Sequence, residues 1–368
     1  MNLNFTVPCL FGLEGLAADE LKRLNFENVQ AENGRVQFSG TEADIAKANI
    51  NLRTGERILL IIGETRANTF DELFEGVKAM PWENFIPKDG EFPVKGHSLG
   101  SKLHSIPDCQ KIIKKATVER LKKAHKTETL AETGAKYQVQ FAIMNDTATL
   151  YLDTSGTGLH KRGYRPAQSA APLRETLAAA IVKLSRYRGR EQVVDPFCGS
   201  GTIPIEAALA ALNRAPGLNR EFSAENWVWL DKKIWENAKK EAKSNEFSGN
   251  YDIIGTDIDP KCIEISKENA KRAGVSDYIR FEVANATELK TGENALLLTN
   301  PPYGERVMEQ KEVQELYRNF GKAPGLDANA KIYILSSHPE FEHFFGKRPK
   351  KKRKLYNGMI KCDLYMYF

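Results

Sequence analysis

The segment "QVVDPFCGSGTIPIEAALAAL", residues 192 to 212, decides the fold class of this chain. A short β-rich run ends in glycines, and an apolar stretch with helical spacing follows at once. Pro204 fits a helix here because proline is tolerated in the first turn. A strand that passes through a glycine loop into a helix opens an α/β sheet, whose ligands lie at the carboxyl ends of the strands.

The same strand and helix alternation continues downstream. Further β-rich runs are "YDIIGTDID", "IRFEVANA", "ALLLTN" and "KIYILSS", and a helix is predicted after the first of them, with Asp259 as N-cap and Gly274 as stop signal. Five strands separated by helices predict a parallel, doubly wound sheet. Asn357-Gly358 lies between two β-rich runs, so we expect the sheet to finish in an antiparallel hairpin.

The first 155 residues follow a different pattern. Short β-like runs such as "RILLIIGET" alternate with helical stretches such as "GLEGLAADELKRL", which predicts two α+β modules of modest size. Asn145-Asp146 between apolar runs indicates a hairpin. Residues 156–172, rich in Gly, Pro, Ser and Arg, are expected to join the halves. The segment 214–250 is an insertion whose role the sequence does not indicate.

Composition sets wider bounds. The 368 residues suffice for two domains, and the apolar share of 41% is ordinary for a soluble protein. A formal charge of +5 favours a polyanionic partner without requiring one. The five cysteines are scattered and form no CxxC pair, which favours a reducing cytoplasm and argues against a metal site. No apolar run approaches the ~18 residues of a membrane span.

The glycine loop and the next strand ends suggest a ligand. Gly199, Ser200 and Gly201 follow Asp195 without the GxGxxG or GK[ST] patterns of nucleotide-phosphate loops, and the helix after them suits a carboxylate. Asp257 could accept hydrogen bonds from ribose hydroxyls, and the amide of Asn285 could meet an adenine edge. Together these sites describe S-adenosylmethionine. Taken singly, the glycines could serve only a tight turn and Asp257 only a helix cap.

A fourth strand end carries the most unusual stretch, "ALLLTNPPYGER" at residues 295–306. Pro301 and Pro302 remove two N–H donors and fix two φ angles, so Asn300 and the neighbouring carbonyls are held in a stiff, extended turn. Rigid acceptors at a strand end indicate recognition of hydrogen-bond donors on a substrate.

Five motifs in order carry a family resemblance: "LHKRGYR", "APLRETLAAAI", "DPFCGSGTIPIEAA", "GTDID" and "NPPYGER". They resemble the bacterial THUMP-domain class I RNA methyltransferases, in particular the N-terminal half of the 23S rRNA guanine-N2 methyltransferase. The resemblance implies a ferredoxin-like subdomain at 1–60, a THUMP RNA-binding domain at 61–155, a linker at 156–172 and a Rossmann-like, S-adenosylmethionine-dependent methyltransferase domain at 173–368. It covers nearly the whole chain.

The same resemblance implies roles for individual residues. The cofactor loop would comprise Asp195, Phe197, Gly199, Ser200 and Gly201, with Asp257 at the ribose. The catalytic tetrad would be Asn300, Pro301, Pro302 and Tyr303. Asn285 departs from the family, since many methyltransferases have Asp there, and this leaves the adenine contact open.

The tetrad suits methylation of an exocyclic amine. Such an amine is a poor nucleophile because its lone pair is delocalised into the base, and the Asn300 side-chain oxygen and Pro301 carbonyl could accept its two N–H groups. The ring of Tyr303 could stack on the base, a role that needs no hydroxyl. Cys198 lies in the cofactor loop, away from the base, and is interpreted as a packing residue.

Two basic stretches, 160–165 and 347–354, are candidates for RNA contact. The residues concerned are His160, Lys161, Arg162, Tyr164 and Arg165 in the first and Lys350, Lys351, Lys352 and Arg353 in the second. The second stretch could equally be a solvated loop or lysine protection of an edge strand.

Several functions are compatible with the sequence. We favour methylation of guanine N2 in structured RNA, 23S rRNA before tRNA. The tetrad also suits adenine-N6 and glutamine methylation, which the RNA-binding resemblance disfavours. A non-catalytic RNA-binding or ribosome-assembly factor is a further alternative, disfavoured by the intact loop, acid and tetrad.

Overall fold

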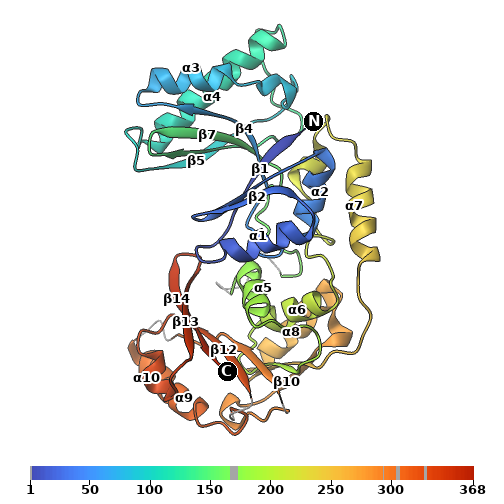
Figure 1. The fold of residues 1–368 in the computed structure, drawn as a ribbon, viewed down its shortest axis with the longest axis vertical. Coiled ribbons are helices and arrows are strands. Elements are labelled where there is room, and N and C mark those ends of the chain that lie inside the picture. Colours follow the sequence, from blue (N-terminus) through green and yellow to red (C-terminus); the bar gives the residue numbers. More distant parts are fainter. Residues whose placement is uncertain (1, 166–172, 293, 304–306, 327–329) are drawn as a thin grey trace.

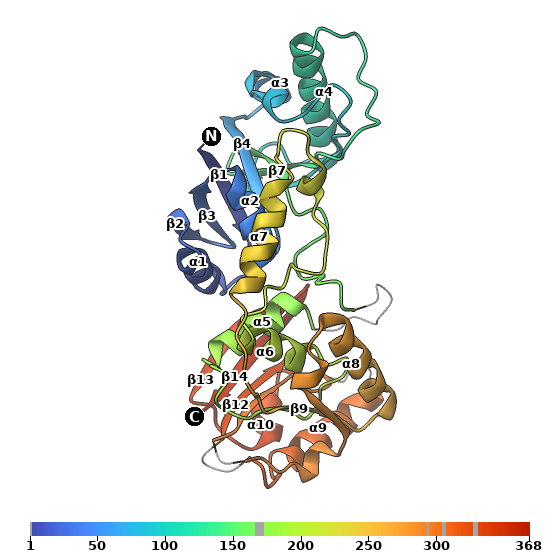
Figure 2. The same cartoon turned by 90° about the vertical axis from the view of Figure 1, so that its right-hand side faces the viewer.

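The computed structural model describes residues 2–165, 173–292, 294–303, 307–326 and 330–368. Figures 1 and 2 show an elongated molecule with the N-terminal half at one end and the half that contains the C-terminus at the other. Each half is built on a seven-stranded sheet. Among the described residues, no helix has the length and apolar character to cross a membrane.

The N-terminal sheet runs without interruption through both expected modules, in the order β2-β3-β1-β4-β7-β6-β5. Its strands are β1 (Leu3–Pro8), β2 (Glu27–Glu32), β3 (Arg35–Gly40), β4 (Leu59–Arg66), β5 (Val94–Leu99), β6 (Val139–Met144) and β7 (Thr147–Asp153). Strand β4 pairs with β1 on one side and β7 on the other, so the boundary expected at residue 60 falls inside a strand. The modules therefore share one sheet.

Four helices cover one face of this sheet. They are α1 (Glu14–Arg23), α2 (Glu42–Asn51), α3 (Phe70–Ala79) and α4 (Ile106–Ala124), with the short 3₁₀ helix η1 (Trp82–Asn84). Their buried side chains form a single core with alternate strand residues such as Phe5, Phe141 and Leu150. The expected hairpin between β6 and β7 is present, with Asn145 and Asp146 both at positive φ (51° and 63°), as a type I′ turn requires.

The second sheet confirms the predicted α/β topology. Its order is β10-β9-β8-β11-β12-β14-β13. The strands are β8 (Val193–Asp195), β9 (Ile253–Asp257), β10 (Arg280–Val283), β11 (Leu296–Thr299), β12 (Lys331–Ser336), β13 (Lys351–Asn357) and β14 (Ile360–Tyr367). The first five pair in parallel, and β14 pairs antiparallel with β12 and β13. The strand order reverses between β8 and β11, which places the ligand crevice there.

Helices flank this sheet on both faces. They are α5 (Glu175–Leu184), α6 (Thr202–Ala211), α8 (Pro260–Ala273), α9 (Val307–Phe320) and α10 (Phe341–Phe345), with the 3₁₀ helices η3 (Ser276–Tyr278) and η4 (Ala286–Glu288). The predicted ends of α8 are confirmed: the Asp259 side chain accepts from Lys261 N, and Gly274 is left-handed (φ 71°).

The insertion between α6 and β9 connects the halves. It contains η2 (Ser223–Asn226) and α7 (Lys233–Ser244), and Figures 1 and 2 show α7 lying beside α2 of the N-terminal half. Phe222, Trp227 and Trp235 are buried in the N-terminal core, and Trp227 stacks on Tyr137 with ring centroids 5.1 Å apart. The methyltransferase half thus contributes aromatic side chains to the core of the other half.

The expected linker is packed where the structure describes it. Leu159 and Tyr164 are 1% and 3% exposed, so residues 156–165 are anchored in the interior at several positions, although Lys161 is exposed. Residues 166–172 lie outside the described residues. Helix α5 begins at Glu175, and every residue from Glu175 to Val182 is buried.

Candidate active site

The glycine loop follows β8 at the crevice. Gly199 and Gly201 have φ of 52° and 80°, a region that favours glycine. A Cβ on Gly201 would lie 3.1 Å from atoms of Phe281 and Ser266, whereas one on Gly199 would meet no atom within 4 Å. Gly201 is thus required by packing and turn geometry together, and Gly199 faces open space that a ligand could enter.

Two side chains of helix α8 hold the glycine loop by donating hydrogen bonds to carbonyl groups of the loop. Ser266 Oγ donates to the Gly199 carbonyl at 2.8 Å, and Asn269 Nδ2 donates to the Ser200 carbonyl at 3.0 Å. Both side chains are buried, and no local sequence pattern marks them beyond their place on α8. Cys198, 6% exposed, belongs to the core, in keeping with a packing role.

Asp195 braces two strand ends. Its Oδ1 accepts from Thr299 Oγ1 at 2.6 Å and from Phe197 N at 3.2 Å, which joins the end of β8 to the end of β11. The side chain is 1% exposed, so the structure does not place it in the direct ligand contact that we expected. Burial raises the pKa of Asp195 to about 7, and the two hydrogen bonds offset part of the rise.

The expected ribose acid lies at the end of β9. Asp257 Oδ2 accepts from Gly199 N at 3.0 Å, and Oδ1 accepts from Asp259 N at 3.0 Å. The Asp257 side chain is only half-buried, so the carboxylate that holds the loop also has an exposed part that a diol could contact. Asn285 is exposed beyond β10, but its side-chain oxygen caps η4 by accepting from Thr287 N at 3.0 Å, which leaves its NH₂ group for an adenine edge.

Two exposed apolar side chains adjoin these polar groups. Ile258, directly after Asp257, is 71% exposed, and Val283, at the end of β10, is 54% exposed. Our sequence interpretation missed both, although an apolar residue directly after an acidic strand end was a readable signal. Apolar surface beside a diol-binding acid, with helix N–H groups at the open loop, fits the adenosine and carboxylate of S-adenosylmethionine.

The tetrad follows β11, next to this loop. The Tyr303 hydroxyl donates to Asn300 Oδ1 and lies 3.9 Å from Cys362 Sγ of β14. Burial raises the pKa of Tyr303, so the phenol stays protonated. The hydroxyl of Tyr317 on α9 donates to the Pro302 carbonyl at 2.6 Å and fixes the turn from behind. The expectation that Tyr303 acts only through its ring is therefore incomplete, because its hydroxyl engages the proposed acceptor.

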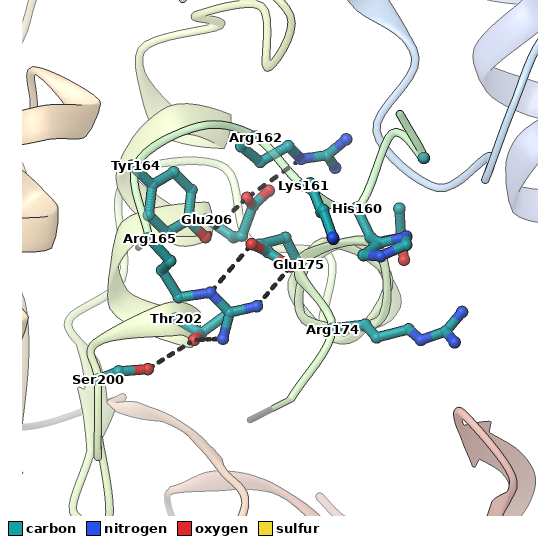
Figure 3. Close-up of polar contacts among 12 residues, drawn as sticks. His160, Lys161, Arg162, Tyr164, Arg165, Arg174, Glu175, Ser200, Thr202 and Glu206 are labelled. Carbon is teal, nitrogen blue, oxygen red and sulfur yellow. Dashed lines mark hydrogen bonds and ion pairs between the residues drawn. The ribbon is translucent and has the colours of Figure 1, made fainter. Parts of the chain in front are cut away.

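The first basic stretch is largely internal (Figure 3). Arg162 and Tyr164 are both 3% exposed. The Tyr164 hydroxyl donates to Glu206 Oε1 at 3.2 Å, and Arg162 Nε donates to the same oxygen at 3.5 Å. The expectation that these two residues bind RNA is wrong, because both side chains are buried and bonded to Glu206 on α6.

Arg165 and His160 also have partners within the protein. Arg165 donates through Nε to Glu175 Oε1 at 3.0 Å and through Nη1 to Thr202 Oγ1 at 3.3 Å, at the start of α6 (Figure 3). His160 Nδ1 lies 3.0 Å from Glu56 Oε2, on the loop before β4. Of the five candidates, Lys161 alone is exposed.

The second basic stretch leads into the edge strand β13, which begins at Lys351. Lys352 Nζ lies 3.0 Å from Glu342 Oε2, Lys350 lies over the Phe368 ring at 5.3 Å, and Arg353 donates to the Gly12 carbonyl. Lys350, Lys351 and Lys352 are nevertheless exposed. Their position at a sheet edge agrees with edge protection as well as with RNA contact.

Comparisons with known families divide the chain as follows. Residues 4–59 match the RlmL ferredoxin-like domain, residues 67–153 the THUMP domain and residues 162–366 the RMKL-like methyltransferase domain. The putative RNA methyltransferase YpsC of Bacillus subtilis is 46% identical over 97% of this chain and 94% of its own length. The ribosomal RNA large subunit methyltransferase K/L of Psychromonas ingrahamii is 36% identical over 99% of this chain, which spans only 50% of that relative.

Solved structures agree with this assignment. A predicted N6-adenine-specific DNA methylase from Listeria monocytogenes is similar with a TM-score of 0.95 and 44% identity, covering 100% of this chain and 96% of its own. SMU.472, a putative methyltransferase solved with S-adenosylhomocysteine, has a TM-score of 0.93 and 39% identity, covering 100% and 98%. The cofactor is therefore S-adenosylmethionine, as the loop and strand ends predict, and the chain belongs to the family of RMKL-like methyltransferases with ferredoxin-like and THUMP domains.

Proposed function

We propose that this protein methylates the exocyclic N2 of a guanine in structured RNA, with 23S rRNA favoured over tRNA. The observation that carries the proposal is the position of Asn300 and Tyr303, at the end of β11 beside the glycine loop, in a chain whose other half matches a THUMP domain. A non-catalytic role would leave the loop, Asp257 and the tetrad without a purpose.

The side chains of the tetrad would prepare the amine for attack. When bound, S-adenosylmethionine supplies an electrophilic methyl group. Asn300 Oδ1 has two lone pairs, so it accepts one N–H of the amine while the Tyr303 hydroxyl holds it in place, and the Pro301 carbonyl accepts the other N–H. These bonds orient the nitrogen lone pair and stabilise the positive charge that develops on nitrogen. The extra proton leaves the amine after methyl transfer, so no general base has to act earlier.

The choice of guanine rests on the family resemblance of the five motifs, and the choice of rRNA rests on relatives. The names of YpsC and of the K/L enzymes refer to RNA and large-subunit rRNA, but this chain spans about half of the K/L relatives, so their activity comes to it only as a proposal. The similar protein from Listeria monocytogenes is described as a predicted N6-adenine-specific DNA methylase, and the same two acceptors suit that amine. The product therefore has to be identified directly.

Nucleoside mass spectrometry of separated rRNA and tRNA from a deletion strain tests the proposal. We expect loss of N2-methylguanosine from 23S rRNA and its return on complementation. Loss from tRNA would move the substrate to tRNA, loss of N6-methyladenosine would replace guanine, and unchanged RNA would refute the proposal.

A further inference from the structure

A polar cleft lies on the N-terminal sheet, outside the methyltransferase site. It has a volume of about 420 Å³ and is lined from both halves of the molecule. The sheet side includes Arg57, Lys95, Lys136, Gln138 and Gln140, and the insertion contributes Glu221, Ser223 and Asn226. Since all four N-terminal helices join the core on the other face, this face is open to a partner.

The side chains that line the cleft carry an excess of positive charge. Arg57 donates to Asp153, which is 1% exposed and also accepts from Gln140 Nε2 at 2.9 Å. That carboxylate is therefore satisfied from inside. Lys95 and Lys136 are exposed, and neither has an ion-pair partner within the described parts of the chain. They outnumber Glu221, the exposed acid on the rim.

The amide side chains favour a ligand with hydroxyl donors. Gln138 Nε2 donates to the Pro93 and Val139 carbonyls at 2.7 and 3.0 Å, and Gln140 Nε2 is bonded to Asp153. With their NH₂ groups bonded inside the protein, the two side chains offer carbonyl oxygens, which accept hydrogen bonds. A 2′-hydroxyl beside a phosphate supplies both the donor and the negative charge that such a cleft would hold.

The insertion also fixes the backbone beside the cleft. Arg220 donates to the carbonyls of Gly158 and Lys161, both at 2.8 Å, and also to that of Thr157, which lines the cleft. This fixes the backbone between the cleft and exposed Lys161. Lys95, Lys136 and Lys161 are thus exposed cations from distant positions in the sequence, without an ion-pair partner among the residues that the structure describes.

We infer that this cleft, with Lys95, Lys136 and Lys161, is where the N-terminal half docks the sugar-phosphate backbone of RNA. The inference rests on the proposed function. It places the RNA contact of this protein away from the run of basic residues on β13, where Lys352 and Arg353 already have partners within the protein. Since both halves line the cleft, docking also sets the distance from the bound RNA to Asn300.

Binding of the full-length protein to a fluorescent RNA hairpin, measured over a range of salt concentrations, tests the inference. The double variant Lys95→Glu/Lys136→Glu should bind at least tenfold more weakly. Its plot of log affinity against log salt should lose a slope of about 0.9 for each phosphate contact removed. Neutral Lys95→Gln/Lys136→Gln should change both quantities in the same direction. A DNA hairpin of the same sequence should bind more weakly than RNA to the wild type.

Lys267→Glu/Lys271→Glu, on exposed positions of α8, makes the same change in net charge and should leave RNA affinity near that of the wild type. Wild-type affinity and slope in the Lys95/Lys136 variants, or an equal loss in the α8 control, would overturn the inference while leaving the proposed function intact. If the wild type binds cofactor but neither binds nor methylates RNA, the proposed function fails with it.

Discussion

At the scale of single residues, Asp195 shows how burial can convert an expected ligand contact into a brace. Its carboxyl joins Thr299 to the loop, and burial raises its pKa to about 7 from an ordinary value of 3.8. A raised carboxyl pKa means that the fold prefers the protonated form, so this group's contribution to stability is lost as the pH rises through about 7.

We therefore predict a pH-dependent difference between the wild type and Asp195→Asn. The amide keeps an oxygen acceptor but cannot ionise, so the melting temperature of the wild type relative to the variant should fall as the pH rises from 3.8 to about 7 and level off above it. Thermal melts of both proteins across that pH range measure the effect. A constant difference would show that Asp195 does not titrate there.

Tyr303 gives a second prediction at this scale. Tyr303→Phe removes only the bond to Asn300 and should lower kcat roughly fivefold, for about 1 kcal/mol of lost orientation. Tyr303→Ala also removes the ring and should add about 1 to 3 kcal/mol of lost stacking to the barrier. Single-turnover methylation of RNA separates the two effects. Equal losses in both variants would contradict a stacking role for the ring.

At the scale of elements, the insertion between α6 and β9 joins the two halves by packing into the core of the N-terminal half. Trp227 is 2% exposed and stacked on Tyr137, whereas its neighbour Val228 is 74% exposed. Trp227→Ala should lower the free energy of unfolding by about 3 to 5 kcal/mol, because it leaves a cavity in a shared core. Val228→Ala is the matched control and should change it little. Urea denaturation measures both, and similar values would refute this role of the insertion.

Local signals explain which elements could be predicted from the sequence. The five parallel strands, the cap at Asp259 and the hairpin at Asn357-Gly358 each depend on neighbours within a few residues, and all are present. The shared N-terminal sheet depends on pairing between β4 and β7, some 90 residues apart, and the role of the insertion on contacts with Tyr137. Such long-range partners leave no local pattern.

The candidate site divides in the same way. Gly199, Asp257 and Asn300 lie at strand ends, where topology alone brings them together. Charge density alone does not identify surfaces for RNA contact, because Arg162 and Tyr164 are buried against Glu206, about 40 positions away. Conversely, Lys95 and Lys136 stand apart in the sequence and become neighbours only in the folded sheet.

At the scale of the whole molecule, the shared core changes what a truncation can show. From the sequence, a fragment of residues 165–368 should bind cofactor and lose RNA methylation. The structure adds that such a fragment would expose Phe222, Trp227 and Trp235, which are buried against the N-terminal half. An exposed apolar cluster of this kind promotes association.

We therefore predict that the fragment 165–368 self-associates, as measured by light scattering coupled to gel filtration. The same fragment with Phe222, Trp227 and Trp235 each replaced by Ser should be monomeric and still bind S-adenosylmethionine. A monomeric unsubstituted fragment would show that the aromatic cluster does not require the N-terminal half.

The most direct test of the central claim combines substrate, product and site. RNA from a deletion strain is incubated with the full-length protein and labelled S-adenosylmethionine, and the labelled nucleoside is identified by mass spectrometry. The wild type should yield N2-methylguanosine in 23S rRNA. Asn300→Ala should lower kcat by about a hundredfold or more while cofactor affinity, measured by calorimetry, stays nearly unchanged. A label on a ring carbon or ribose, or an Asn300→Ala enzyme with wild-type turnover, would contradict the account.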